Sequence, residues 1–504
     1  MSKDELNTQV LIKNYFNEKG FVDFDLESFN NFIDIELQQI IDENKEVEPT
    51  IVPPNVDEFK IRLDKIKVEK PQIIEADGSK RDIYPVEARL RNLTYAAPML
   101  LEISSHINGI QRESFEIQIG NLPIMIKSKK CHLCNSSREE LIKHGEDPDD
   151  PGGYFIINGS EKTIIKVEDL APNKMLITKE KLGISEYVGK IFSEAGSYKI
   201  PHTLEKLKDG ILYLSFTRVK RVPVIAIVKA LGMLKDQEIM ECIGLGEDST
   251  IFINLFECVD IKTREDALDY IAKKIGISQS KEIRVERTKD ILDKYLLPNL
   301  GIKDEEALFK AENLCKMLKR FLLVSSGKIP TDDKDHYMNK RLKLSSDSLA
   351  DLLRVNIKVL IGDMLYNFQR IVKRGKFPSI RVIIREKLLT QRIQSAMATG
   401  NWIGGRKGIS QRIERLNFLQ MISHLQRVVS PLSASQENFQ ARALHATHMG
   451  RICTSETPEG SNIGLRKNLA LLCTVSQTSK DDNLIKKLKE LGLNLTNNLK
   501  TEVN

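Results

Sequence analysis

The alternation of apolar and polar residues predicts β-strands in the first third of the chain. Short alternating runs at 61–68 and 114–120 have the period of half-buried strands. Two β-prone runs within 154–167 flank Asn158-Gly159, a pair that supplies the positive φ angles of a tight hairpin turn. The first 50 residues are different: their pattern predicts a helical segment that ends near Pro49, before a break at Pro53-Pro54.

The pattern changes after residue 174 to shorter strands and helices. Residues 211–216 predict a strand, and 264–275 predict a helix closed by Gly276. A second helical spacing is formed by Leu308, Ala311, Leu314, Leu318 and Phe321. We interpret residues 176–346 as a separate, inserted unit, closed by the polar loop 331–341.

Helical and basic sequence follows from residue 348. A helix is predicted over 410–429, with Ser410 as its N-cap and with Arg412 and Arg415 toward the polar side. Its expected buried stripe consists of Ile413, Leu416, Ile422, Leu425 and Val429. The last 29 residues predict one short amphipathic helix. Together these patterns indicate an α+β protein of several domains.

Charge is distributed very unevenly along the chain. Residues 1–50 hold four Lys against twelve Asp or Glu, a net charge of −8. Residues 351–430 hold fifteen Lys or Arg against four Asp or Glu, a net charge of +11. Such a block is the electrostatic signature of a surface that binds a polyanion. A solvated helix face gives the same pattern, and charge alone does not decide between the two.

Length and composition narrow the class of protein. A chain of 504 residues predicts three or four domains at about 150 residues each. Its longest clean apolar run, 222–228, is far shorter than the roughly 20 residues of a membrane-spanning helix. No secretory signal is visible at the N-terminus, and seven cysteines are sparse. We therefore expect a cytoplasmic protein that does not bind a membrane.

Motifs for a self-contained active site are missing from the sequence. No phosphate loop, zinc-protease helix or nucleophile elbow is found, and Cys131 and Cys134 lack the second pair of a structural zinc site. Two segments remain. Residues 398–412 place four glycines around Arg406 and Lys407, which suits phosphate binding or a flexible connector. Residues 444–471 contain two histidines, which suit ligands, bases or core side chains.

Several motifs resemble the second-largest subunit of cellular DNA-directed RNA polymerases. The most specific lie at 445–453, 456–460 and 462–465, and they resemble the signature of that family's fork region. Further similar segments follow the family's order at 87–99, 119–131, 152–162, 332–342 and 398–402. The resemblance covers most of 60–475, is loose over 176–330 and hardly includes the first 50 residues.

This resemblance implies a domain organisation. A protrusion domain would comprise 1–175 and 347–405, interrupted by an inserted lobe domain at 176–346. The fork would follow at 406–480, and 481–504 would form a C-terminal extension that leads toward the rest of the subunit. Because the chain ends soon after the fork signature, it resembles the N-terminal half of the subunit that certain archaea make as two polypeptides.

The resemblance also implies residue roles. The family's hybrid-facing stretch matches Arg406, Gln411, Arg415, His424 and Arg427, and Lys407 lies beside the first of these. Arg442, Glu459 and Lys467 match fork positions, the first expected to contact nucleic acid and the other two expected near the active centre. The chain would carry no catalytic residue and bind no cofactor, since the largest subunit of this family holds the catalytic Mg²⁺.

The expected function is therefore that of a polymerase subunit in DNA-templated transcription, a nucleotidyltransferase that is inactive alone. It would form one side of the DNA cleft and part of the RNA–DNA hybrid channel. Expected partners are the chain with the other half of the subunit, the largest subunit, template DNA and the hybrid, with the protrusion and lobe as candidate docking sites for transcription factors. The alternative is a stand-alone nucleic-acid-binding protein that uses a similar fold.

Overall fold

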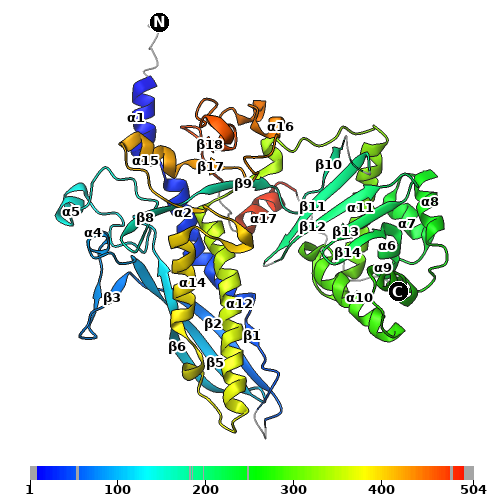
Figure 1. The fold of residues 1–504 in the computed structure, drawn as a ribbon, viewed down its shortest axis with the longest axis horizontal. Helices are drawn as coiled ribbons and strands as arrows, with labels where there is room; N and C mark the ends of the chain where they lie inside the picture. The colour runs from blue at the N-terminus through cyan, green and yellow to red at the C-terminus, as the bar shows by residue number, and fades with distance from the viewer. Residues whose placement is uncertain are drawn as a thin grey trace.

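Two bodies lie side by side in the molecule, and a layer of short strands and loops joins them (Figure 1). The structure is a computed structural model that describes residues 8–52, 56–180, 183, 185–196, 198–246, 249–476 and 481–492. Helices and strands are mixed throughout, and among the described strands the β17–β9 pair is the parallel one. The expected mixture of α and β structure is confirmed.

An antiparallel sheet and the helices packed on it form the first body. Its strands follow the spatial order β1 (Glu46–Val47), β2 (Phe59–Val68), β5 (Ala96–Ile107) and β6 (Ile110–Pro123). The helices are α2 (Asp23–Asn31), the π-helix η1 (Phe32–Glu36), α3 (Leu37–Asp42), α12 (Ser345–Val372) and α14 (Glu386–Thr399). One hydrophobic core joins sheet and helices. The strands predicted at 61–68 and 114–120 are confirmed.

The second body has its own sheet and its own core. The sheet runs β10 (Leu176–Lys179), β11 (Tyr187–Ala195), β12 (Tyr198–Lys206), β13 (Leu212–Phe216) and β14 (Val219–Pro223). Its helices are α6 (Val224–Ala230), α7 (Asp236–Ile243), α8 (Ser249–Glu257), α9 (Arg264–Ile275), α10 (Lys281–Tyr295) and α11 (Ala307–Ser325). Its buried apolar residues lie between Met175 and Val324, apart from the first core. The strand at 211–216 and the helix closed by Gly276, whose φ is 87°, are confirmed.

Short strands from distant parts of the chain form the joining layer. One sheet has the order β15 (Lys340–Lys343), β9 (Lys166–Leu170), β17 (Arg427–Val429) and β18 (Arg466–Asn468). A second has the order β16 (Ser410–Arg412), β8 (Ser160–Ile164) and β7 (Phe155–Ile157). In the predicted hairpin Ile157 pairs with Ser160 around Asn158-Gly159, where both φ angles are positive, so that prediction is confirmed.

The helix predicted over 410–429 is wrong. The segment forms β16, a loop, the short helix α15 (Phe418–Leu425) and β17. Residues at both ends pair with strands β8 and β9, and Asn417, not Ser410, caps the helix. Leu416, expected in the buried stripe, is 86% exposed. Helical spacing within one segment cannot reveal partner strands that lie more than 200 residues away.

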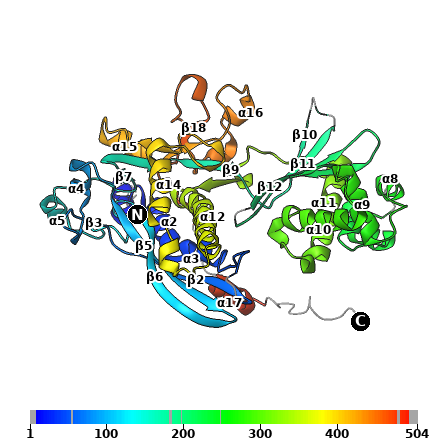
Figure 2. The same ribbon diagram turned by 60° about the horizontal axis from the view of Figure 1, so that its bottom comes forward.

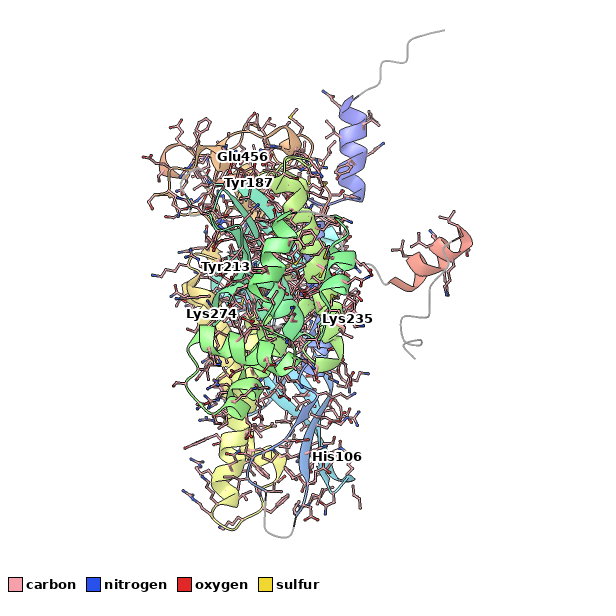
Figure 3. The ribbon with its side chains drawn as sticks, turned by 90° about the vertical axis from the view of Figure 1, so that its right-hand side faces the viewer. His106, Tyr187, Tyr213, Lys235, Lys274 and Glu456 are labelled. Carbon is pink, nitrogen blue, oxygen red and sulfur yellow. The ribbon has the colours of Figure 1, made fainter. Side chains whose placement is uncertain are left out.

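The ends of the chain contain further helices. The acidic N-terminal segment is helical as predicted, from α1 (Thr8–Glu18) to the end of α3, and β1 follows before Pro49. The predicted break at Pro53-Pro54 lies outside the described residues. A helix near the C-terminus, α17 (Asp481–Glu490), is also confirmed. Figure 3 shows α17 set apart from both bodies, whereas it overlaps the end of β2 in the view of Figure 2.

The remaining elements are short. They are β3 (Gln72–Ile74), β4 (Lys80–Asp82), α4 (Pro85–Leu90), α5 (Arg138–Lys143), α13 (Ile380–Ile383), α16 (Phe439–Arg442) and the 3₁₀ turns η2 (Pro298–Leu300), η3 (Asp304–Glu306), η4 (Tyr337–Asn339), η5 (Ile403–Gly405), η6 (Ala446–His448) and η7 (Gly460–Asn462). None of the helices that the structure describes is both long enough and apolar enough to cross a membrane.

Candidate nucleic-acid interface

The glycine-rich loop between α14 and β16 is anchored by its tryptophan. The indole Nε1 of Trp402 donates a buried hydrogen bond of 2.9 Å to the carbonyl of Ser348, in the first turn of α12. The Trp402 amide donates to the carbonyl of Arg406 at 2.8 Å, which closes the loop. Arg406 and Lys407 are exposed, and neither forms an ion pair with any carboxylate of the described residues. The loop therefore presents two free cations on a fixed backbone.

Gln411 and His424 hold one another in place. His424 is 1% exposed, and its Nδ1 accepts a hydrogen bond of 3.2 Å from the amide of Glu414. The neutral ring then carries its proton on Nε2, which lies 3.2 Å from the Gln411 Oε1 and donates to it. Burial and the neighbouring Arg427 lower the pKa of His424 to about 4. His424 is therefore a neutral residue that orients Gln411.

Arg415 belongs to an ion-pair network of the first body. Its guanidinium binds both carboxylate oxygens of Glu161 and lies 2.8 Å from the Oδ2 of Asp150. Its charged carbon also lies 5.3 Å from the ring centre of Tyr154. Arg89 binds the same Glu161 at 2.8 Å. Most of the positive charge of Arg415 is neutralised within the protein.

Arg427 and Arg442 also have partners inside the chain. The Arg427 guanidinium lies 3.5 Å from the carboxylate of Glu414, and its side chain is only 15% exposed. Arg442 joins two loops through four hydrogen bonds to main-chain oxygens. These acceptors are the carbonyls of Ser461 (2.7 Å), Ile463 (3.1 Å), Ala434 (2.9 Å) and Gln436 (3.3 Å). The donors of Arg442 are thus used to fix loop geometry.

Lys467 lies in a buried network rather than at a surface. It is 5% exposed, and its Nζ lies 2.9 Å from the Oε1 of Glu168. The other carboxylate oxygen of Glu168, Oε2, accepts a hydrogen bond of 2.5 Å from the hydroxyl of Tyr337. Burial lowers the pKa of Lys467. Burial opposes the ionisation of Glu168, but the charges of Lys467 and Lys340 outweigh it and hold that pKa below its ordinary value. His448, whose pKa burial lowers to about 4, packs on Tyr337.

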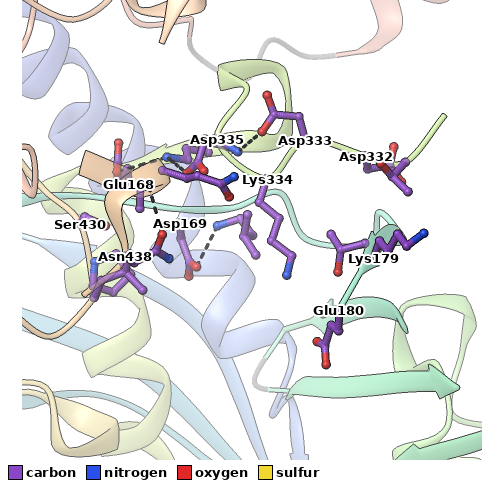
Figure 4. Close-up of a pocket in the computed structure, with 18 residues that line it drawn as sticks. Glu168, Asp169, Lys179, Glu180, Asp332, Asp333, Lys334, Asp335, Ser430 and Asn438 are labelled. Atoms are coloured by element: carbon purple, nitrogen blue, oxygen red, sulfur yellow. Dashed lines mark hydrogen bonds and ion pairs between the residues drawn. The ribbon is translucent and has the colours of Figure 1, made fainter. Parts of the chain in front are cut away.

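A cavity of about 560 Å³ lies beside this network, where the two bodies meet (Figure 4). Glu168 and Asp169 line it from β9, and Asp332 and Asp333 line it from the polar loop. These carboxylates are engaged: Asp169 by Lys199 at 2.5 Å, Asp332 by Arg320 at 2.7 Å, and Asp333 by His445 at 2.9 Å. Two of these contacts, Asp169 with Lys199 and Asp333 with His445, join the second body to the joining layer and to the fork segment.

Glu459 is placed differently from Lys467, although both were expected near an active centre. It is exposed immediately before η7, on the turn that precedes Gly460. No hydrogen bond or ion pair of its carboxylate is found within the described part of the chain. Of the nine expected site residues, the structure leaves Arg406, Lys407 and Glu459 free at the surface and engages the other six.

The basic block of 351–430 does not coincide with the predicted interface. Of its fifteen cations, five lie at 406–427, two at 354–358 and eight at 370–392. The eight belong to the end of α12, to α14 and to the segment between them. Sequence reasoning missed this second position because it treated the charge as one block; counting in shorter windows would have separated the two.

The cysteine side chains of the described residues form no metal site. Cys131 is buried, its Sγ lies 3.4 Å from the hydroxyl of Tyr95, and burial raises the pKa of its thiol. Across the described residues, no group of three or more His, Cys, Asp and Glu side chains has the arrangement of a metal site. Of the two histidines of 444–471, His445 instead forms a hydrogen bond with Asp333 of the polar loop, and the ring of His448 packs on Tyr337.

Comparison with known proteins identifies the family. The model of the family described as RNA polymerase beta subunit matches residues 20–391, and that described as RNA polymerase Rpb2, domain 3, matches 411–475. The chain is 44% identical to DNA-directed RNA polymerase subunit Rpo2N of Methanocaldococcus jannaschii, over 96% of this chain and 99% of that protein. The chain therefore belongs to the RNA polymerase beta subunit family, and the resemblance seen in its motifs is confirmed.

Some relatives are matched by this chain over almost their whole length, and others over less than half of it. The Rpo2N protein of Methanococcus vannielii is 42% identical and is also covered over 99% of its length. DNA-directed RNA polymerase subunit Rpo2 of Saccharolobus solfataricus is 43% identical over 96% of this chain, but the match covers only 43% of that protein. The chain thus spans less than half of the length of this last relative.

Proposed function

We propose that this chain is the N-terminal half of the second-largest subunit of a DNA-directed RNA polymerase, made as a separate polypeptide. It serves DNA-templated transcription by forming one side of the DNA cleft and part of the hybrid channel. The observation that carries this proposal is the anchored glycine loop, which presents unpaired Arg406 and Lys407 beside the segment that matches the Rpb2 domain. The two relatives named Rpo2N, covered almost completely, support the division of the subunit.

The two hydrophobic cores support part of the domain assignment. We assign 1–175 and 347–405 to the protrusion, 176–346 to the lobe, 406–480 to the fork and 481–504 to an extension toward the rest of the subunit. The separate cores of the two bodies support the division between protrusion and lobe. The joining layer of β9, β15, β17 and β18 supports a fork that is built across both.

Roles within the interface are of two kinds. Arg406 and Lys407 contact sugar-phosphate, because a cation without a carboxylate partner can neutralise a phosphate without reading the base. Gln411 contacts the same strand through an amide that His424 orients. Arg415, Arg427, Arg442 and Lys467 instead position the loops that surround the nucleic acid. Glu459 faces the catalytic elements from the surface of the fork.

The assembly supplies what this chain lacks. The partners are the chain with the other half of the subunit, the largest subunit with its catalytic Mg²⁺, template DNA and the RNA–DNA hybrid. The chain alone is inactive as a nucleotidyltransferase, since it contributes binding surface rather than the metal. Transcription factors dock on exposed faces of the protrusion and lobe.

Reconstitution tests the proposal. The chain alone should incorporate no nucleotide, and addition of the other subunits should give templated RNA synthesis. In the assembled enzyme, R406S/K407S should shorten the lifetime of elongation complexes and lower the slope of log affinity against log salt by about one to two, which corresponds to two lost phosphate contacts. A matched loss of two exposed lysines from the second body, K208S/K220S, should change neither quantity.

Two outcomes would contradict the proposal. The first is synthesis by the chain alone. The second is a reconstituted enzyme whose complex lifetime and salt slope are the same with R406S/K407S as with K208S/K220S. If the native chain migrates as a monomer in extracts of its own cells, the stand-alone nucleic-acid-binding protein becomes the better explanation.

A further inference from the structure

A second basic surface lies at the far end of helix α12, away from the glycine loop. Ser348, which holds Trp402, lies in the first turn of α12, and Val372 is the last residue of that helix. The 24 residues between them span about 36 Å at 1.5 Å per residue. Figure 1 shows this end of α12 and α14 beside the end of the β5–β6 hairpin, far from α15, β17 and β18. His106, labelled in Figure 3 near the end of β5, lies at this same end of the molecule.

This surface, which we call the hairpin-end patch, consists of exposed cations from α12, α13, the segment between them and β6. Five come from the end of α12 and the segment that follows it, and one comes from β6. They are Arg370, Lys373, Arg374, Lys376, Arg381 and Arg112. None of these six side chains forms an ion pair with a carboxylate in the described ranges. The patch is therefore an uncompensated concentration of positive charge.

Aromatic rings pack against two of the arginine side chains of the patch. Phe59 of β2 stacks on Phe368 of α12, with ring centres 4.7 Å apart, and Phe377 packs edge-on against Phe59 at 5.5 Å. The guanidinium of Arg112 lies 4.2 Å above the ring centre of Phe377. Arg381 has the same relation to Phe115, also at 4.2 Å. Because cation–π contacts use the flat face of a guanidinium, its N–H groups remain available at the edges.

Two of the carboxylates at the border of the patch pair with cations outside it, and a third, Glu113, is hydrogen-bonded to a hydroxyl. Glu58 pairs with Lys60 at 2.6 Å, and Asp363 pairs with Arg385. Glu113 accepts a hydrogen bond of 3.4 Å from the hydroxyl of Ser379. This distribution differs from an ordinary solvated helix face, where cations and carboxylates are interspersed and pair with one another.

We propose that the hairpin-end patch binds the phosphate backbone of double-stranded DNA, at a site separate from the glycine loop. The length of α12 between Ser348 and Val372, about 36 Å from its rise per residue, is close to one turn of B-DNA, about 34–36 Å, so that one duplex can reach from the glycine loop to the patch. Six clustered cations can contact several of the phosphates that repeat along a duplex. Contacts to phosphates do not depend on the base sequence. The choice of DNA as the polyanion rests on the proposed function, whereas the binding of a polyanion rests on the patch alone.

Binding of the full chain to a fluorescent 30-base-pair duplex tests this proposal. The variant K373S/R374S/K376S should lower the slope of log affinity against log salt by about 2.7, that is 0.9 for each of three lost contacts. Between 50 and 200 mM salt, its affinity should therefore fall about 40-fold less than that of the wild-type chain. The control variant K208S/K220S/K262S removes three exposed lysines of the second body and should keep the wild-type slope.

A second patch variant and a competing polyanion test the proposal independently of the first variant. R370S/R381S changes other residues of the patch and should lower the slope by about 1.8; equal melting temperatures show that each variant is folded. Wild-type slopes in both patch variants would overturn the proposal. So would poly-glutamate that displaces the chain as well as an equal charge of duplex, because the ligand would then be an acidic polypeptide. Failure of reconstituted transcription would contradict the proposed function and leave this binding result intact.

Discussion

Most cations near the N-terminal end of helix α12 have partners within the protein, whereas those near its C-terminal end do not. Near its N-terminal end, the fork segment carries six predicted cations. Arg415, Arg427 and Lys467 pair with carboxylates and Arg442 binds main-chain carbonyls. Arg406 and Lys407 are exposed and have no carboxylate partner among the described residues. At its C-terminal end, the cations of the hairpin-end patch have no carboxylate partner among the described residues. Net charge along the sequence does not distinguish these cases, because the neutralising carboxylates come from distant segments.

Burial explains the difference. An ionised group removed from water must gain a partner of opposite charge or hydrogen bonds, or its charged form becomes too costly. Lys467 meets that condition through Glu168, whose strand β9 is about 300 residues earlier in the sequence. The cations of the patch remain hydrated and need no partner. The buried charges of the fork thus fix structure, whereas the exposed charges of the glycine loop and of the patch are available to a ligand.

The largest effect is expected when the buried ion pair of Lys467 and Glu168 is broken. K467M should lower the free energy of unfolding by about 3–5 kcal/mol, because Glu168 then loses its nearest counter-charge while it remains buried. Chemical denaturation of the full chain measures this change. The substitution K373M, at an exposed position of the patch, should change the same free energy by less than about 0.5 kcal/mol.

The double variant sharpens this test. E168Q/K467M replaces both charges, and the glutamine can still accept the hydrogen bond from Tyr337. It should recover more than half of the stability that K467M loses, since no unpaired charge stays buried at this position. If K467M is as stable as K373M, Lys467 is not a structural residue and the contrast between the two ends of α12 is lost.

The next effect concerns pH and the two buried histidines. His424 and His448 have pKa values of about 4 in the folded chain, against 6.5 when unperturbed. Below pH 6.5 the unfolded chain takes up protons that the folded chain does not, so stability falls as the pH decreases from about 6.5 to about 4. The loss approaches about 3 kcal/mol for each histidine.

The substitution H424N isolates the contribution of His424 to the pH dependence of stability. Asparagine at position 424 offers an oxygen in place of the Nδ1 that accepts from Glu414, and it does not titrate. Between pH 6.5 and 4, the unfolding free energy of H424N should therefore decrease by about 3 kcal/mol less than that of the wild-type chain. Parallel pH curves for the two proteins would mean that His424 is protonated in the folded state and available as a cation.

The sequence predicted local features well and long-range ones poorly. The hairpin at Asn158-Gly159 and the helix closed by Gly276 depend on neighbouring residues, and both were found. The helix predicted over 410–429 failed because β16 and β17 pair with strands from the region of residue 165. The family motifs indicated candidate interface residues, but they could not show which of these cations lack a partner within the chain. That distinction depends on side chains such as Glu161 and Glu168, which the fold brings in from far away.

The smallest expected effect tests a cation that binds no carboxylate. Arg442 donates to four carbonyls of two loops, and a lysine at this position has a single head group that cannot reach both loops in the same way. R442K should lower the free energy of unfolding by about 1–2 kcal/mol and speed proteolysis of the loop 431–438. The control R451K changes an exposed arginine with one such bond, to the carbonyl of Thr447, and should cost less than about 0.5 kcal/mol. Equal stability and equal proteolysis in the two variants would return Arg442 to the group of cations that are free to bind nucleic acid.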